Sequence, residues 1–146
     1  MATEISTIRS RIQTAVNAMA GMSVSIHPYE RFSSTPNTIA HLRFACGVVG
    51  VEGRPDDRQR QAQGILADTS IGIRFTYRIR PKDQVTSYDE AWDKATDIAQ
   101  TVTNRSPTIY SDIQIRFSRM THEVLTSGEF IIITLFFQIL HYIPLV

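Results

Sequence analysis

The chain has 146 residues, of which 42% are hydrophobic and 20% are charged, and its formal net charge is +1. This length and balance describe one globular domain, residues 1–146, with enough apolar material for a core and no room for a second domain. The small net charge argues against a dedicated nucleic-acid binder, and the single cysteine, Cys46, excludes an intramolecular disulfide and a cysteine-rich zinc site.

The first part of the chain predicts a helix and a short strand. The opening residues carry scattered charges and no apolar run, so we expect neither a secretory signal nor a membrane span there, and a protein that stays in the cytoplasm where it is made. An amphipathic helix is predicted over residues 4–20, with Thr3 as its N-cap and Gly21 as its stop. A strand near residues 24–26 and a polar loop to about Asn37 follow. The apolar residues at helical spacing are Ile5, Ile8, Ile12, Val16 and Met19.

The middle of the chain predicts two strands joined by a long connection. Residues 38–51 form the first, in which Gly47 and Gly50 indicate a β-bulge or a close approach by another backbone. Residues 70–80 alternate between apolar and polar side chains, which predicts a half-buried strand with a basic outer face. The connection, residues 53–68, is longer than a hairpin needs, and such loops are usually functional or disordered.

The strongest helix signal lies in the second half of the chain. Ser87 and Glu90 have the spacing of a capping box, and Asp89, Glu90 and Asp93 would lie at the positive end of the helix dipole. An apolar stripe predicts that this helix runs to about Thr103 and lies on the sheet.

The chain ends in an apolar segment, residues 130–146. Before it, apolar and polar residues alternate from Ile113 to Phe117, which predicts a strand that turns near Ser127 and Gly128 and leads into this segment. As a helix the segment would span about 25 Å, short of the roughly 30 Å hydrocarbon core, and its content of Ile, Phe, Thr and Tyr favours a strand over a membrane anchor. As a strand it is apolar on both faces, so one face covers the core and the other requires another layer, another subunit or a bilayer. The residues of this second face, which we call the assembly face, are Phe130, Ile132, Phe136, Leu140 and Tyr142.

This order of elements predicts an α+β fold. In its simplest packing, two helices cover one face of a mainly antiparallel sheet of about four to five strands, which gives two layers with a long hairpin loop.

The chain offers no pattern for catalysis, a metal or a cofactor. His27, His41, His122 and His141 lack the spacing of a metal site, and each is expected at a surface or interface. His122 and Glu123 would point to opposite faces of a strand, which argues against an acid/base pair. Phosphate-binding and nucleophile motifs are absent, and the single cysteine is expected to be buried among apolar neighbours. We therefore expect a protein that is not an enzyme.

Arginine dominates the basic residues, with 13 of 15. Arginine tolerates partial burial and binds planar acceptors with two hydrogen bonds, which suits protein interfaces and phosphate contacts. Arg74, Arg78 and Arg116 would form a positive stripe on the outer face of the sheet, past which DNA could thread. Ordinary solvated positions explain these residues equally well.

The whole arrangement resembles the tail terminator, or tail completion, proteins of tailed bacteriophages and related neck proteins. The resemblance covers nearly the whole chain and rests on the order and lengths of its elements. These are the opening helix IRSRIQTAVNAM, the hairpin with GRPDDRQRQAQ, the helix SYDEAWDKATDIAQTV, and the closing strands SDIQIRF and EFIIITLFFQI. It implies a small structural protein of the virion that forms a ring, typically a hexamer, on the head-proximal end of the tail tube. Such a ring ends tube polymerisation and offers a surface to the neck.

The resemblance also implies partners and sites. The partners are further copies of the chain, the tail tube protein and neck or connector proteins, with transient contact to genomic DNA and no membrane. The protein would act in the host cytoplasm during assembly and remain in the virion, with the arginine stripe towards the lumen. Another neck component, such as a head-closure or adaptor protein, and a small C-terminally membrane-anchored protein are the alternatives. The residues of the long connection that would dock on the tail or neck are Arg54, Asp56, Asp57, Arg58 and Arg60.

Overall fold

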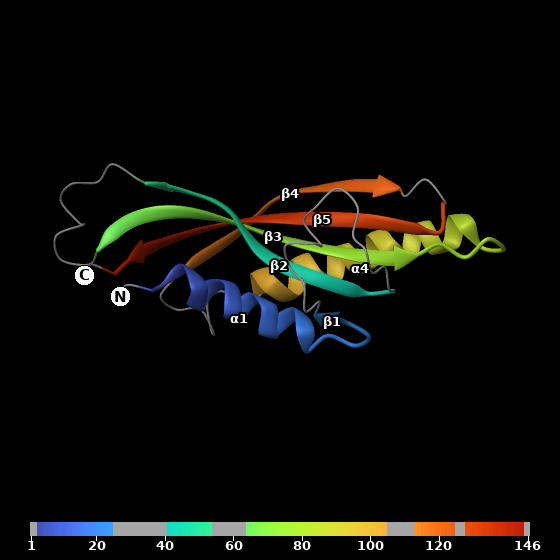
Figure 1. Ribbon diagram of the computed structural model, residues 1–146, viewed down its shortest axis with the longest axis horizontal. Helices are drawn as coiled ribbons and strands as arrows, with labels where there is room; N and C mark the ends of the chain where they lie inside the picture. Colours follow the sequence, from blue (N-terminus) through green and yellow to red (C-terminus); the bar gives the residue numbers. More distant parts are fainter. Residues whose placement is uncertain (1–2, 25–40, 54–63, 105–112, 125–127, 145–146) are drawn as a thin grey trace.

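The computed structural model describes residues 3–24, 41–53, 64–104, 113–124 and 128–144 (Figure 1). Within these ranges the chain forms two α-helices and one five-stranded sheet, which confirms the predicted α+β class. In chain order the elements are α1 (Ile5–Asn17), β1 (Ser23–Val24), β2 (Arg43–Gly53), β3 (Ile65–Arg78), α4 (Gln84–Asn104), β4 (Gln114–Val124) and β5 (Phe130–Ile143).

The sheet is mixed, with the strand order β1-β2-β3-β5-β4. β1 contributes only Ser23 and Val24, which pair in parallel with Arg43 and Phe44 of β2. The other neighbouring strands are antiparallel. β5 follows all other elements in the chain, yet it lies between β3 and β4 and pairs with β3 over the full 14 residues of each strand. β3 and β5 therefore form the centre of the sheet, and β2 and β4 flank them.

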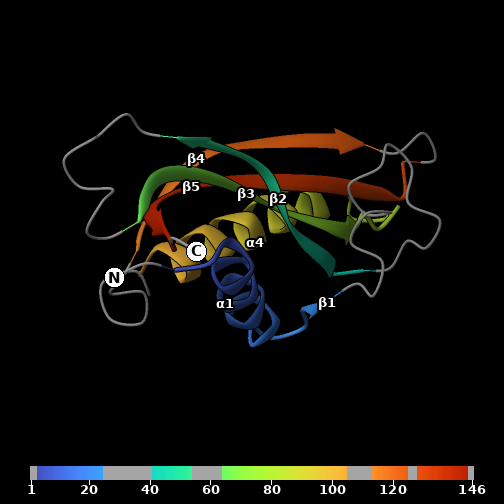
Figure 2. The ribbon, with the colours of Figure 1, turned by 60° about the vertical axis from the view of Figure 1, so that its left-hand side comes forward.

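The core lies between the sheet and the two helices, which Figures 1 and 2 show on the same side of the sheet. Burying a large aliphatic or aromatic side chain stabilises a fold by about 1.5–3 kcal/mol, so this contact dominates the stability. The core residues of α1 are Ile8, Ile12 and Val16, and those of α4 are Ala91, Ala95, Ile98 and Val102. Those of β5 are Ile131, Ile133, Leu135, Phe137 and Ile139, each 0% exposed.

The apolar C-terminal segment is a strand, as predicted, so a helical membrane anchor over Phe130–Ile143 is the wrong interpretation. Its alternate residues separate into a core-facing side and the assembly face, because side chains on a strand have a period of two. Among the described residues, no helix combines the length and the hydropathy needed to span a membrane.

The predicted ends of α1 are wrong. Glu4 occupies the N-cap and makes no side-chain hydrogen bond to the helix. Thr3 instead is 5% exposed, and its amide donates to the carbonyl oxygen of Tyr142 at 2.8 Å, so a partner on β5 replaces the predicted cap. The helix ends at Asn17, and Gly21, with a φ of +81°, lies in the turn that follows.

The capping box predicted for α4 is also wrong. The helix begins at Gln84, because the Ser87 amide already donates to the carbonyl oxygen of Asp83 at 2.8 Å. Ser87 is 0% exposed, and its hydroxyl accepts a hydrogen bond from the Arg80 amide at 3.1 Å. The serine therefore ties the chain leaving β3 to the first turn of α4, and no acidic residue lies in that turn.

Two β-bulges shape the flanking strands. The register of β2 shifts between Val48 and Gly50, which confirms the bulge predicted from its glycines. The register of β4 shifts between Phe117 and Arg119, and this bulge breaks the alternation of side chains. β4 continues to Val124, shortly before the turn that was predicted near Ser127 and Gly128. β3 begins at Ile65, inside the segment that was predicted to be a loop, so the predicted end of that loop is wrong.

Candidate assembly surfaces

The face of the sheet opposite the core, which we call the outer face, carries a group of arginines. Arg74 and Arg78 of β3 and Arg116 of β4 lie on it, as the alternation along their strands predicted. Arg43 of β2 lies on the same face by alternation, and Arg119 of β4 does so because it pairs with Phe136 after the bulge. The sequence pattern does not indicate Arg119, because the bulge breaks the alternation before it.

Two arginines of the predicted stripe have polar neighbours on the outer face. A nitrogen of Arg74 lies 3.4 Å from a carboxylate oxygen of Glu123, and these side chains are 12% and 55% exposed. Burial lowers the pKa of Arg74, and the charge of Glu123 opposes that shift. The Arg116 guanidinium donates to the side-chain oxygen of Gln138. His122 points to the other side of β4 from Glu123, as predicted, with its ring against α4.

The five residues of the assembly face lie along the outer face of β5. Ile132 is 2% exposed, and the other four are half-buried. The guanidinium of Arg119 lies over the Phe136 ring, 4.6 Å from its centre. A cation in this position contributes about 0.5–1 kcal/mol at an exposed site, so this arginine partly shields the apolar face from water. An assembly role for this face stays a prediction.

The residues predicted to dock on the tail or neck lie outside the described residues. They belong to the segment between Gly53, where β2 ends, and Ile65, where β3 begins. Their role therefore stays a prediction for Arg54, Asp56, Asp57, Arg58 and Arg60.

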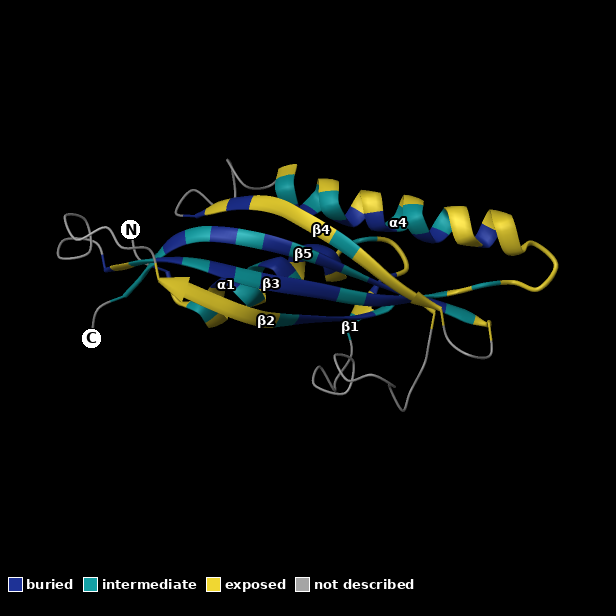
Figure 3. Cartoon of the chain, turned by 90° about the horizontal axis from the view of Figure 1, so that it is seen from above, coloured by how far each residue is buried: buried dark blue, intermediate teal, exposed yellow. Residues whose placement is uncertain are grey.

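β2 and β4 present two long edges of the sheet. In the described chain, β2 pairs only with β3 beyond its short contact with β1, and β4 pairs only with β5. Edge strands offer backbone groups to another chain, and soluble proteins usually protect such edges with charges. Figure 3 shows exposed residues along β4 and the end of β2. Several are apolar: Val48 (43% exposed), Val49 (54%) and Val51 (43%) on β2, and Phe117 (39%) and Val124 (52%) on β4.

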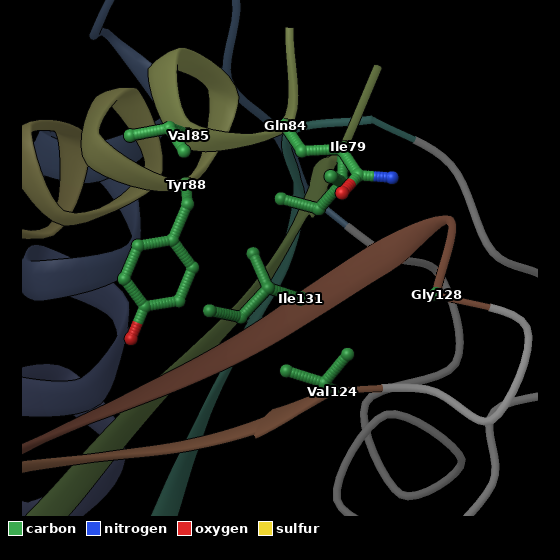
Figure 4. A pocket seen from close by; sticks show the side chains of 7 residues that line it. All are labelled: Ile79, Gln84, Val85, Tyr88, Val124, Gly128 and Ile131. Carbon is green, nitrogen blue, oxygen red and sulfur yellow. The ribbon is translucent and has the colours of Figure 1, made fainter. Parts of the chain in front are cut away.

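An apolar groove of about 410 Å³ opens between the first turns of α4 and the neighbouring ends of β4 and β5 (Figure 4). Val85 and Tyr88 come from the helix, and Val124 and Ile131 come from the strands. Apolar walls favour an apolar side chain over a small charged substrate. The complete lining is Ile79, Gln84, Val85, Tyr88, Val124, Gly128 and Ile131.

A polar cluster joins the end of β3 to α4. The Tyr77 hydroxyl donates to one carboxylate oxygen of Glu90 at 2.9 Å, and the Arg80 guanidinium donates to the other at 3.2 Å. The hydrogen bonds from Arg80 and Tyr77 lower the pKa of Glu90. Burial, followed by the contact with Glu90, raises the pKa of Tyr77. These hydrogen bonds hold the end of β3 against α4. Among the described residues, no cluster of three or more His, Cys, Asp or Glu could hold a metal ion.

His141 was wrongly expected at a surface or interface, since it is 2% exposed. Its Nδ1 lies 3.2 Å from the carbonyl oxygen of Thr3, so Nδ1 carries a proton and donates it. Its Nε2 lies 2.6 Å from the Thr69 hydroxyl, from which it accepts a hydrogen bond. The two other histidines in the described ranges are exposed, and His27 lies outside those ranges.

Cys46 is buried, as predicted, at 1% exposed, and burial raises the pKa of its thiol to about 12. We expect the native protein to react with a thiol reagent such as DTNB at least about 1,000-fold more slowly than the unfolded chain. The thiolate must form before it reacts, and opening a core position costs on the order of 5 kcal/mol. The rate of thionitrobenzoate release, with and without denaturant, measures this protection. Equal rates would contradict the buried position.

Comparison with protein-family models and with curated proteins found no match for this chain.

Proposed function

We propose that this protein is a phage tail terminator, an oligomeric ring that caps the head-proximal end of the tail tube. The ring ends tube polymerisation and provides the attachment surface for the neck and head. The order and lengths of the elements support the tail assignment, and the two sheet edges support the ring. As part of the same proposal, the fold has two layers, one of helices and one of strands, and a long hairpin joins β2 to β3.

The observation that carries the ring is that the two edges are unlike and run in opposite directions. β2 is antiparallel to β3, β3 to β5, and β5 to β4, so β4 runs opposite to β2. A rotation about an axis along the strands brings β4 of one copy beside β2 of the next as an antiparallel pair. Repetition of one such heterologous contact closes a ring when the rotation permits. The exposed valines on β2 and the exposed Phe117 and Val124 on β4 would lose contact with water in this contact.

The proposal gives roles to the predicted sites. The outer face lines the lumen, where Arg74, Arg78 and Arg116 meet passing DNA, and a neighbouring subunit completes the cover of the assembly face. The segment between β2 and β3 docks on the tube or neck. The protein is made in the host cytoplasm and stays in the virion.

A head-closure or adaptor protein of the neck is the second candidate, because unlike edges would serve any ring in this region. The two candidates differ in what the particle lacks when the protein is missing.

We expect that a nonsense mutation in its gene, in the virus that encodes it, gives full heads and over-long tail tubes that do not join. Electron microscopy of the lysate measures tube lengths. Unjoined tails of normal length would show a neck component instead, and normal infectious particles would exclude both candidates. Native mass spectrometry of the purified protein in detergent-free buffer tests the ring itself, for which a mass near six subunits is expected.

A further inference from the structure

We infer that β4 of one copy pairs with β2 of the next in the register that the protein's own sheet already sets. The inference rests on the proposed ring and adds which residues meet in it. Two independent pairs of groups on the two edges lie at the same or neighbouring levels, along the part of β2 that β1 leaves open in the described chain.

β1 limits where a second copy can pair. It already pairs with Arg43 and Phe44, so in the described chain the open edge of β2 runs from Ala45 to Gly53. A ring formed by rotation about an axis along the strands has no shift along them, so each row of one copy continues into the same row of the next. We call this pairing the unshifted register.

At one end of this open edge, a negative and a positive side chain lie close together on the outer face. Glu52 pairs with Asp68, Asp68 with Leu140, and Leu140 with Gln114. Arg116 follows Gln114 by two residues on the same face of β4. In the unshifted register it is the diagonal neighbour of Glu52 in the next copy, at about 7–8 Å between backbones, which an arginine side chain spans. Opposite charges across neighbouring strands stabilise the pairing, and like charges oppose it.

On the core-facing side, the exposed apolar groups of the two edges also share a row. Phe117 pairs with Phe137, Phe137 with Ile71, and Ile71 with Val48. Phe117 is 39% exposed and Val48 is 43% exposed. Phe117 of one copy therefore faces Val48 of the next, and aromatic residues pair well with β-branched residues across antiparallel strands.

The two β-bulges lie on opposite sides of the row that contains Phe117 and Val48. The extra residue of β2, Val49, lies between the rows of Ile71 and Ser70, and the extra residue of β4, Ser118, lies between the rows of Phe137 and Phe136. Bulges bend an edge and interrupt regular pairing. In the unshifted register we therefore expect the backbone pairing between copies to be interrupted on both sides of this row and regular beyond it.

A pair of engineered cysteines tests the register. Gly50 and Arg116 lie in one row, through Ser70 and Gln138, and a side chain at Gly50 would meet no atom within 4 Å. The full chain would carry Gly50→Cys and Arg116→Cys and would be oxidised after the rings have assembled. We expect a ladder of disulfide-linked oligomers on a non-reducing gel. Native Cys46 is 1% exposed and does not compete.

The control keeps Arg116→Cys and moves the second cysteine to Gly53, where a side chain also meets no atom within 4 Å. Position 53 lies on the other face and three residues along, so we expect at least about tenfold less ladder, because a disulfide needs Cα atoms within about 7 Å. Rings that link better through position 53, or through neither, overturn the register and leave the ring intact. A chain that stays monomeric without any ladder overturns both.

A charge exchange provides a second measurement that needs no disulfide. Glu52→Arg and Arg116→Glu each place like charges at the contact, and each is expected to weaken association by about tenfold. The double variant restores opposite charges and is expected to recover most of the affinity. Measuring the mass of each variant over a range of protein concentrations gives the association affinity of the single and the double variants. Double variants that associate no better than the single ones contradict this contact.

Discussion

Replacing Phe137 with alanine is expected to lower the free energy of unfolding by about 3–5 kcal/mol, and replacing the adjacent Phe136 should cost much less. Phe137 is 0% exposed and lies in the core, with its ring edge-on to Phe117 at 5.9 Å between centres. Phe136 points to the outer face, where it is half-buried beneath Arg119. The same atoms are deleted in both variants, so the difference isolates the two faces of β5.

Urea denaturation followed by circular dichroism measures both variants. Domains of this size are stable by about 5–15 kcal/mol, so the loss in the Phe137→Ala protein is a large part of the total and should lower its urea midpoint strongly. Equal losses for the two variants would contradict the division of β5 into a core face and an outer face. A folded Phe136→Ala protein that forms weaker rings would support the assembly face.

Replacing His141 with alanine is expected to lower the free energy of unfolding by about 2–3 kcal/mol. The variant leaves a cavity and removes two hydrogen bonds, each of which contributes about 0.5–1.5 kcal/mol. The bond to the Thr3 carbonyl joins the start of α1 to β5, so the region around Thr3 should also become more sensitive to protease.

Two further variants make this prediction specific. Thr69→Val keeps the shape of the side chain and removes the hydroxyl that donates to His141, so the two losses should not add in the double variant. His122→Ala removes an exposed ring and serves as the control, with an expected loss of less than about 1 kcal/mol. Additive losses at His141 and Thr69, in chemical or thermal denaturation, would contradict the hydrogen bond between them.

The centre of the fold follows directly from the sequence. β3 and β5 alternate or are apolar on both faces, and the period of two places each residue on its face before any partner is known. The core faces of both helices follow in the same way from their apolar stripes. These patterns are local, because each depends only on residues a few positions apart.

The failures come from partners that are distant or geometrically irregular. Thr3 binds Tyr142 at the other end of the chain, and Ser87 binds the backbone that precedes its helix. Neither partner is visible in a local capping pattern. The prediction for His141 failed for the same reason, since its partners are Thr3, just before α1, and Thr69 on β3.

The same difference between local patterns and distant partners applies to the candidate assembly surfaces. The positions of Arg74, Arg78 and Arg116 on the outer face were predictable from alternation within their own strands. The match between the edges was not, because it depends on strand order and on two bulges. No local pattern indicates that β5 enters the sheet between β3 and β4.

That strand order determines when the core can form during synthesis of the chain. β5 leaves the ribosome after every other element, yet it supplies the middle of the sheet. Before β5 has been made, β3 has a partner strand on one side only and β4 has none, so the core cannot close. Incomplete chains therefore lack the platform that holds β2 and β4 at a fixed separation. Only a chain that contains β5 presents both edges at once, so products that stop before β5 are excluded from any assembly that needs both edges.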